Sequence, residues 1–174
     1  MTTNAAETEF DTFLNSFNYE VCDEMKIDSK GLVPLLTTGK AILVDVRFVE
    51  EVSAWRSGFS VNIPLNEFPK RINELPKNKV IVTACPHKDR SAIAMAYLRS
   101  KGYNAKYLTD DLIGLSEHLR GERAKDFVED MNKLGQGITA KYFSPTILQN
   151  FLLLQLKVFL QAPSNPVYAI CKRL

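Results

Sequence analysis

A polar segment that starts with a cysteine follows a short apolar run near the middle of the chain. The apolar run covers residues 79–84 (KVIVTA), and the segment after it consists of Cys85, Pro86, His87, Lys88, Asp89, Arg90 and Ser91. A strand ending at the cysteine, a short loop and a helix starting near Arg90 would point backbone N–H groups at the sulfur. These dipoles and the neighbouring cations favour the thiolate, the nucleophilic form of cysteine. The segment therefore predicts a reactive Cys85 in a substrate-binding loop of residues 86–91.

A buried structural cysteine at the end of a core strand is the alternative interpretation. The polar residues that follow Cys85 argue against it, and we expect the thiol to be open to solvent. His87 either assists proton transfer and anion binding or is simply exposed, since imidazole titrates near neutral pH. Cys22 and Cys171 are interpreted as inert thiols. Three dispersed cysteines and two histidines do not form a zinc site, so we expect neither a metal nor another cofactor.

Apolar runs alternate with helical patterns over residues 28–119, the region that must position the loop. The strand-like runs are residues 41–47, 79–84 and 106–108, and helical patterns cover residues 68–75 and 91–100. Within residues 91–100 we expect the side chains of Ile93, Met95, Ala96 and Leu98 to face inward. Pro34 leaves the structure of residues 32–36 open, because proline is tolerated in a helix mainly in the first turn. The alternation predicts an α/β fold, an open parallel sheet with helices on both faces.

Both ends of the chain are expected to be helical extensions. Residues 1–28 contain an apolar stripe with helical spacing (Phe10, Phe13, Leu14 and Phe17), and Thr8 precedes it as a candidate cap. The stripe requires a partner surface, so this helix is expected to dock. A second stripe (Ala124, Phe127, Val128, Met131 and Leu134) ends at Gly135. The predicted domains are residues 1–28, 29–120 and 121–174.

A further helix is predicted over residues 145–161, with Ser144 as its cap and Pro145 at its first position. This helix is apolar nearly all round, which is typical of a helix buried against another surface. We therefore expect homodimerisation or close docking through residues 121–174.

The residues around Cys85 resemble the rhodanese-like (single-domain sulfurtransferase) family. Three blocks carry the resemblance: residues 43–47 (LVDVR) followed by Glu50, Glu51 and residues 61–65 (VNIPL); Leu75-Pro76-Lys77 followed by Cys85-x-x-x-x-Arg90-Ser91; and Leu98, Gly102, Tyr103 and Leu108. The resemblance implies a sulfurtransferase in which Cys85 takes sulfane sulfur from thiosulfate or a persulfide and passes it to a thiol or protein acceptor. The implied kinetics are ping-pong, because the sulfur is held covalently between two half-reactions.

Two other functions remain open beside the sulfurtransferase. One is a rhodanese-like binding or regulatory module without turnover, which dimerises or docks through its C-terminal helices. The other is a phosphatase, but related phosphatases carry five residues between cysteine and arginine, and this chain has four, which favours a single sulfur atom.

Several residues depart from the family pattern. Pro86 has no N–H to donate, Lys88 replaces a glycine, and Asp89 adds a negative charge that opposes thiolate formation. Asp110 and Asp111 replace a glycine pair, and two carboxylates beside the loop would repel thiosulfate. Residues 55–57 (WRS) and Leu115 replace a Gly-His-Ile block and a tryptophan.

Asp45, Arg47 and Glu51 are expected to form a structural polar cluster at the end of the first strand-like run, near the site. His118 is expected on the surface of a helix. The 174-residue chain is 45% hydrophobic with a net charge of +2, a balance that offers no support for a nucleic-acid or anionic membrane partner. It shows neither a signal peptide nor a long apolar span, so we expect a cytoplasmic protein.

Overall fold

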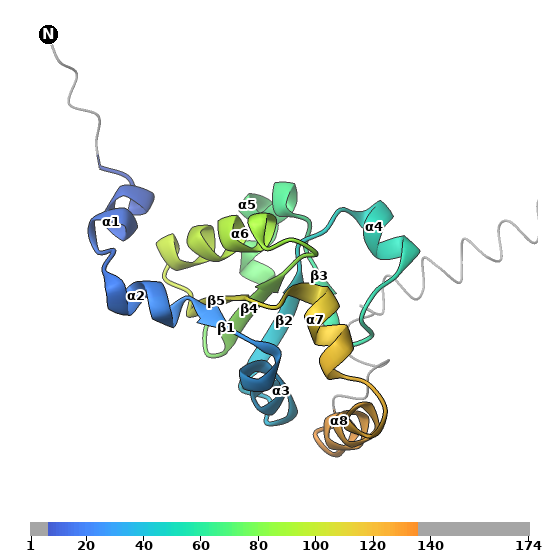
Figure 1. Ribbon diagram of the computed structural model, residues 1–174. Coiled ribbons are helices and arrows are strands. Elements are labelled where there is room, and N and C mark those ends of the chain that lie inside the picture. The colour runs from blue at the N-terminus through green and yellow to red at the C-terminus, as the bar shows by residue number, and fades with distance from the viewer. Residues whose placement is uncertain (1–6, 136–174) are drawn as a thin grey trace, which may run out of the picture. The chain divides into compact units, whose positions relative to one another are not determined.

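A five-stranded parallel sheet forms the centre of the structure, a computed structural model that describes residues 7–135 (Figure 1). The strands are β1 (Lys26–Ile27), β2 (Ala41–Asp45), β3 (Ser60–Asn62), β4 (Val80–Ala84) and β5 (Ala105–Leu108). They lie in the order β1-β5-β4-β2-β3, and each neighbouring pair is parallel. The predicted α/β class is confirmed. The sequence does not reveal β1 and β3, because two or three residues are too few to display a hydrophobic period.

Helices cover both faces of this sheet (Figure 1). They are α1 (Glu9–Asn15), α2 (Tyr19–Glu24), α3 (Ser29–Thr37), α4 (Val49–Ala54), α5 (Phe68–Arg71), α6 (Asp89–Ser100), α7 (Asp111–His118) and α8 (Glu122–Lys133). Alternate residues of a strand point to opposite faces, so β2 contributes Ile42 and Val44 to the core under α5 and α6. Ala41 and Leu43 of the same strand lie in the second core, under α3, α7 and α8.

Helix α6, which follows the loop after β4, presents a different face to the core from the one expected. Ala94, Met95 and Leu98 are buried, whereas the side chain of Ile93 is 59% exposed. The inward orientation predicted for Ile93 is therefore wrong. Ala94 and Leu98 are four residues apart and share one side of the helix. Ile93 precedes Ala94 by one residue, so its side chain points to a different side.

The N-terminal helix α1 begins at a capping box, as the sequence predicts. The Asp11 N–H donates to the Thr8 side chain (3.2 Å), and the Thr8 N–H donates to the Asp11 carboxylate (2.8 Å). Phe13 packs against the core beside α6, but Phe10 and Leu14 stay exposed, so only part of the stripe docks. Helix α3 includes Pro34 in its second half; Asp28 caps its start, and Leu32 and Leu36 are buried against the sheet.

Helix α8 belongs to the same packed layer as α3 and α7. Phe127 and Met131 are buried in the second core, and the Phe127 ring meets Phe59 edge-on with centroids 4.8 Å apart. Val128, also placed in the stripe, is exposed. The domain boundaries stay predictions, and the helix expected over residues 145–161 lies outside the described residues. Within residues 7–135, none of the helices is long and apolar enough to cross a membrane.

We expect Phe127→Ala to lower the free energy of unfolding by about 3–4 kcal/mol, because it removes a buried aromatic ring and leaves a cavity. Urea unfolding of the full chain measures this loss. Val128→Ala is the matched control in the same helix, and it should cost less than about 1 kcal/mol because its side chain is exposed. Equal losses in the two variants would show that α8 does not depend on the core contact.

Candidate active site

Cys85 follows β4 directly, at the carboxyl ends of the central strands. Its carbonyl oxygen accepts the Leu112 N–H at the start of α7 (3.3 Å), and the carbonyl of Ala84 accepts the N–H of Val46 (3.1 Å). Residues 86–88 then lead into α6, which starts at Asp89, one residue from the predicted start. The cysteine is therefore held between the end of a buried strand and the first turn of a helix, where ligands bind in open parallel sheets.

The sulfur of Cys85 makes its hydrogen bonds to the first turn of α6. The Ser91 N–H donates to Sγ over 3.4 Å. The thiol proton has two acceptors within reach, the Ser91 Oγ at 3.5 Å and the Asp89 Oδ1 at 3.6 Å. Ser91 Oγ in turn donates to the Lys88 carbonyl (2.9 Å). The sequence leads us to expect several loop N–H groups at the sulfur, but Pro86 has none and the Asp89 N–H donates to the carbonyl of His87 (2.9 Å).

The thiol is covered, not open to solvent. Cys85 is 0% exposed and lies at the edge of the core with Val46, Ala94 and Met95, so the expectation of an open sulfur is wrong. The loop above it is polar and exposed at His87, Lys88 and Asp89, as predicted for these residue types. Because the Asp89 carboxylate is exposed and touches the sulfur, it forms part of the cover between Cys85 and solvent.

Lys88 adopts a left-handed backbone conformation at the turn into α6, with φ of 69°. A side chain makes this region costly, and glycine adopts it freely. The family pattern has a glycine at the position of Lys88, and a left-handed turn explains why glycine is favoured there. Its carbonyl accepts the Ala92 N–H (2.8 Å) as well as the Ser91 hydroxyl, and these bonds hold the turn in place.

A bidentate ion pair ties the loop to α4. Arg90 Nη1 lies 2.6 Å from Glu51 Oε2, and Arg90 Nη2 lies 3.0 Å from Oε1. The hydrogen bonds from Arg90 lower the pKa of Glu51 to about 2, and the carboxylate raises the pKa of Arg90. The Phe48 N–H also donates to Glu51 at the start of α4 (3.1 Å). The arginine charge is therefore shared with a carboxylate and is not directed at the thiol alone.

Asp45 and Arg47 form a separate, fully buried pair at the end of β2. Arg47 Nη2 lies 2.6 Å from Asp45 Oδ2, and its Nε lies 2.9 Å from Oδ1. The guanidinium also donates to the Trp55 carbonyl (3.0 Å) and stacks over the Trp55 ring at 3.8 Å. The single cluster expected from the sequence is thus divided into two pairs, and Glu51 belongs to the loop.

The carboxylates of Asp110 and Asp111 are used as backbone caps. Asp110 accepts the Ser29 N–H at the start of α3 (3.1 Å to each oxygen). Asp111, with a positive φ of 54°, accepts the N–H groups of Ile113 (2.7 Å) and Gly114 (3.2 Å) at the start of α7. Both charges are therefore held by N–H groups of α3 and α7, which weakens the expected repulsion of thiosulfate by this pair. Gly114 is required here, because a Cβ on it would lie 2.7 Å from the Asp110 Cβ.

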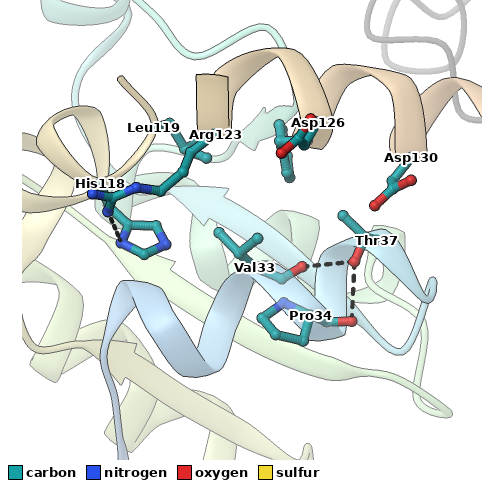
Figure 2. A pocket seen from close by; sticks show the side chains of 9 residues that line it. Val33, Pro34, Thr37, His118, Leu119, Arg123, Asp126 and Asp130 are labelled. Carbon is teal, nitrogen blue, oxygen red and sulfur yellow. Dashed lines mark hydrogen bonds between the residues drawn. The ribbon is translucent and has the colours of Figure 1, made fainter. Parts of the chain in front are cut away.

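A hollow of about 290 Å³ lies away from the cysteine, between α3, α7 and α8. Figure 2 shows His118 beside it, with Nδ1 3.5 Å from Nη1 of Arg123. Val33, Pro34 and Phe127 give this hollow an apolar wall.

Cys22 is a free, half-buried thiol, and Cys171 lies outside the described residues. In the part of the chain that the structure describes, no group of three or more His, Cys, Asp or Glu residues is arranged to hold a metal ion.

Comparison with known proteins identifies the family. Residues 30–114 match the rhodanese-like domain. A sulfurtransferase of Allochromatium vinosum is 34% identical over 79 residues, which cover 45% of this chain and 74% of the relative. The chain therefore belongs to the rhodanese-like family, as the motifs around Cys85 predict.

Two solved structures share the fold. The reduced CoADR-RHD of Bacillus anthracis is 28% identical with a TM-score of 0.50, over 54% of this chain and 17% of that one. This chain thus spans about a sixth of that protein. A protein from Lactobacillus plantarum is 23% identical with a TM-score of 0.51, over 56% of this chain and 87% of that one, and shows likeness in fold. Both agree with a parallel sheet flanked by helices.

We expect Glu51→Gln to lower the free energy of unfolding by about 1 kcal/mol at pH 7, a value reduced for the solvent exposure of this side chain. The folded pKa of about 2 is below the ordinary 4.5, so ionised Glu51 stabilises the fold fully above pH 4.5. This contribution is lost as the pH falls from 4.5 to 2. Urea unfolding at several pH values measures the difference between wild type and variant, which should narrow over that interval.

The neighbouring Glu50 provides the matched control. Its side chain is exposed, so Glu50→Gln should leave the stability within about 0.5 kcal/mol of wild type. A gap between wild type and Glu51→Gln that stays constant down to pH 2 would contradict the assignment of the stabilising charge to Glu51.

Proposed function

We propose that this chain is a sulfurtransferase in which Cys85 carries sulfane sulfur as a persulfide, from a donor such as thiosulfate or an organic persulfide to a thiol or protein acceptor. The observation that carries the proposal is the hydrogen bond from the Ser91 N–H to the Cys85 sulfur, at the first turn of α6. An N–H donor at a helix N-terminus stabilises an anion on that sulfur. The relationship to a sulfurtransferase adds independent support.

The proposed reaction has two displacement steps that leave the protein unchanged overall. The Cys85 thiolate attacks the outer sulfur of the donor and forms a new S–S bond. The old bond to that sulfur breaks, and its electron pair leaves with sulfite or with the donor thiolate. An acceptor thiolate then attacks the outer sulfur of the persulfide, so the acceptor gains the sulfur and the Cys85 thiolate is restored.

The residues of the loop have distinct roles in this proposal. Ser91 supports the charge on the sulfur through its N–H, and its hydroxyl lies 3.5 Å from Sγ. Arg90 and Glu51 hold the loop against α4. The exposed Asp89 carboxylate contacts the covered sulfur, so it lies beside any donor that reaches Cys85. The four residues between Cys85 and Arg90 favour a single sulfur atom over a phosphate.

A rhodanese-like binding or regulatory module is the second candidate, and the complete burial of Cys85 favours it. In that case the cysteine has a packing role, and the protein acts by docking to a partner. The two functions differ in one measurable property, because only the sulfurtransferase takes up sulfur on Cys85.

We expect incubation of the full chain with thiosulfate or glutathione persulfide to add one sulfur, about 32 mass units, to the peptide that contains Cys85. Mass spectrometry of the intact protein and of its peptides detects the addition. Cys85→Ser should abolish it, whereas Cys22→Ser, the control, should retain it. Cyanide or a thiol should then remove the added mass. Uptake that persists in Cys85→Ser, or no uptake from either donor, would overturn the proposal.

A further inference from the structure

The Asp89 carboxylate is exposed and contacts the sulfur of Cys85, which is itself covered. We propose that Asp89 determines which sulfur donors Cys85 accepts: it disfavours dianions such as thiosulfate and favours donors that carry an organic group and at most one negative charge. This inference rests on the proposed function and specifies its substrate class.

The first step of the argument is the contact between the carboxylate and the thiol. Asp89 Oδ1 lies 3.6 Å from Cys85 Sγ, and Asp89 is exposed whereas Cys85 is 0% exposed. A donor that reaches the sulfur must place its leaving group beside this carboxylate. Two like charges at such a separation repel each other, and the repulsion grows with the charge of the donor.

The second step concerns the cations that could offset this charge. Arg90 directs two N–H groups at both oxygens of Glu51, so its charge is already paired. Lys88 and Asp89 are both exposed and screened by solvent, but it is the Asp89 carboxylate that contacts the sulfur. The backbone N–H of Arg90 holds the pKa of Asp89 below its usual range, so this carboxylate is ionised at neutral pH. The negative charge of Asp89 therefore lies directly beside the sulfur, next to the N–H donor of Ser91.

The third step concerns the apolar side of the loop. The Phe48 ring is 47% exposed, and the Arg90 Cζ lies 5.7 Å from its centroid. Val49, the next residue, is also exposed. Because Arg90 belongs to the loop that holds the sulfur, the exposed Phe48 ring lies against that loop and offers an apolar surface there. Contact with such a surface favours binding of a donor with an organic group, whereas the sulfite part of thiosulfate has no apolar surface to bury.

Two donors differ in charge and in the presence of an organic group. Thiosulfate and benzenethiosulfonate both present an outer sulfur bonded to a sulfonyl sulfur. In each reaction the Cys85 thiolate bonds to the outer sulfur, and the electron pair of the broken bond leaves with sulfite or with benzenesulfinate. The leaving groups differ by one unit of negative charge, and the second carries a phenyl ring.

The experiment measures the second-order rate constant of sulfur loading on the full chain, by intact mass, in wild type and Asp89→Asn. Removing one negative charge should accelerate loading by the dianion about tenfold and by the monoanion about threefold. The preference for benzenethiosulfonate over thiosulfate should therefore fall about threefold in the variant. In wild type, added salt should raise the rate constant of loading by thiosulfate more than that of loading by benzenethiosulfonate.

Asp126→Asn is the matched control, because it removes the same charge from α8 (Figure 2), on the opposite face of the sheet from α6 (Figure 1). It should leave the preference unchanged. Equal acceleration of both donors by Asp89→Asn, or no change, would overturn the role of Asp89 and leave the persulfide function standing. Failure of both donors to load wild-type Cys85 would overturn the function itself and this inference with it.

Discussion

The hydrogen bond from the Ser91 N–H to the Cys85 sulfur joins the end of β4 to the start of α6, and the geometry of the site follows from it. Ser91 is fully buried and fixed on more than one side. Its carbonyl accepts the Thr83 hydroxyl (2.8 Å) from within β4, and its own hydroxyl donates to Lys88. Strand and helix are thus held together on both sides of the cysteine. The sulfur lies at the positive end of a 12-residue helix, where a negative charge is most stable.

The sequence predicts the elements that carry the site, because their signals are local. Continuous apolar runs indicate β2 and β4, and the change to polar residues after Cys85 marks the loop. The covered state of the sulfur has no such signal, since it depends on how Cys85 packs with Val46, Ala94 and Met95 and on its contact with Asp89. The pairing of Glu51 with Arg90 joins residues 39 positions apart, so periodicity cannot reveal it. The sequence predicts an inward Ile93, whereas the structure exposes it, because hydrophobicity alone does not distinguish a core side chain from an exposed neighbour on the same helix.

The buried pair of Asp45 and Arg47, separate from Glu51, is a second arrangement that the sequence alone does not reveal. Two charges placed in the core require nearly ideal partners, because the loss of hydration is large. Asp45 meets this need with several bonds to Arg47, and Arg47 finds a further acceptor and an aromatic face at Trp55. Trp55 stands where the family pattern has another residue type, so this departure acquires a structural reason. The Trp55 carbonyl and ring add an acceptor and an aromatic face to an arginine that Asp45 already pairs.

At the turn before α7, the residue at position 110 restricts which residue fits at position 114. With Asp110 folded onto the start of α3, its Cβ occupies the space that a side chain at position 114 would need. A larger residue at position 114 therefore requires either a glycine at position 110 or a shift of the backbone there. The two positions are coupled, so a design that enlarges residue 114 must also change the turn at residue 110.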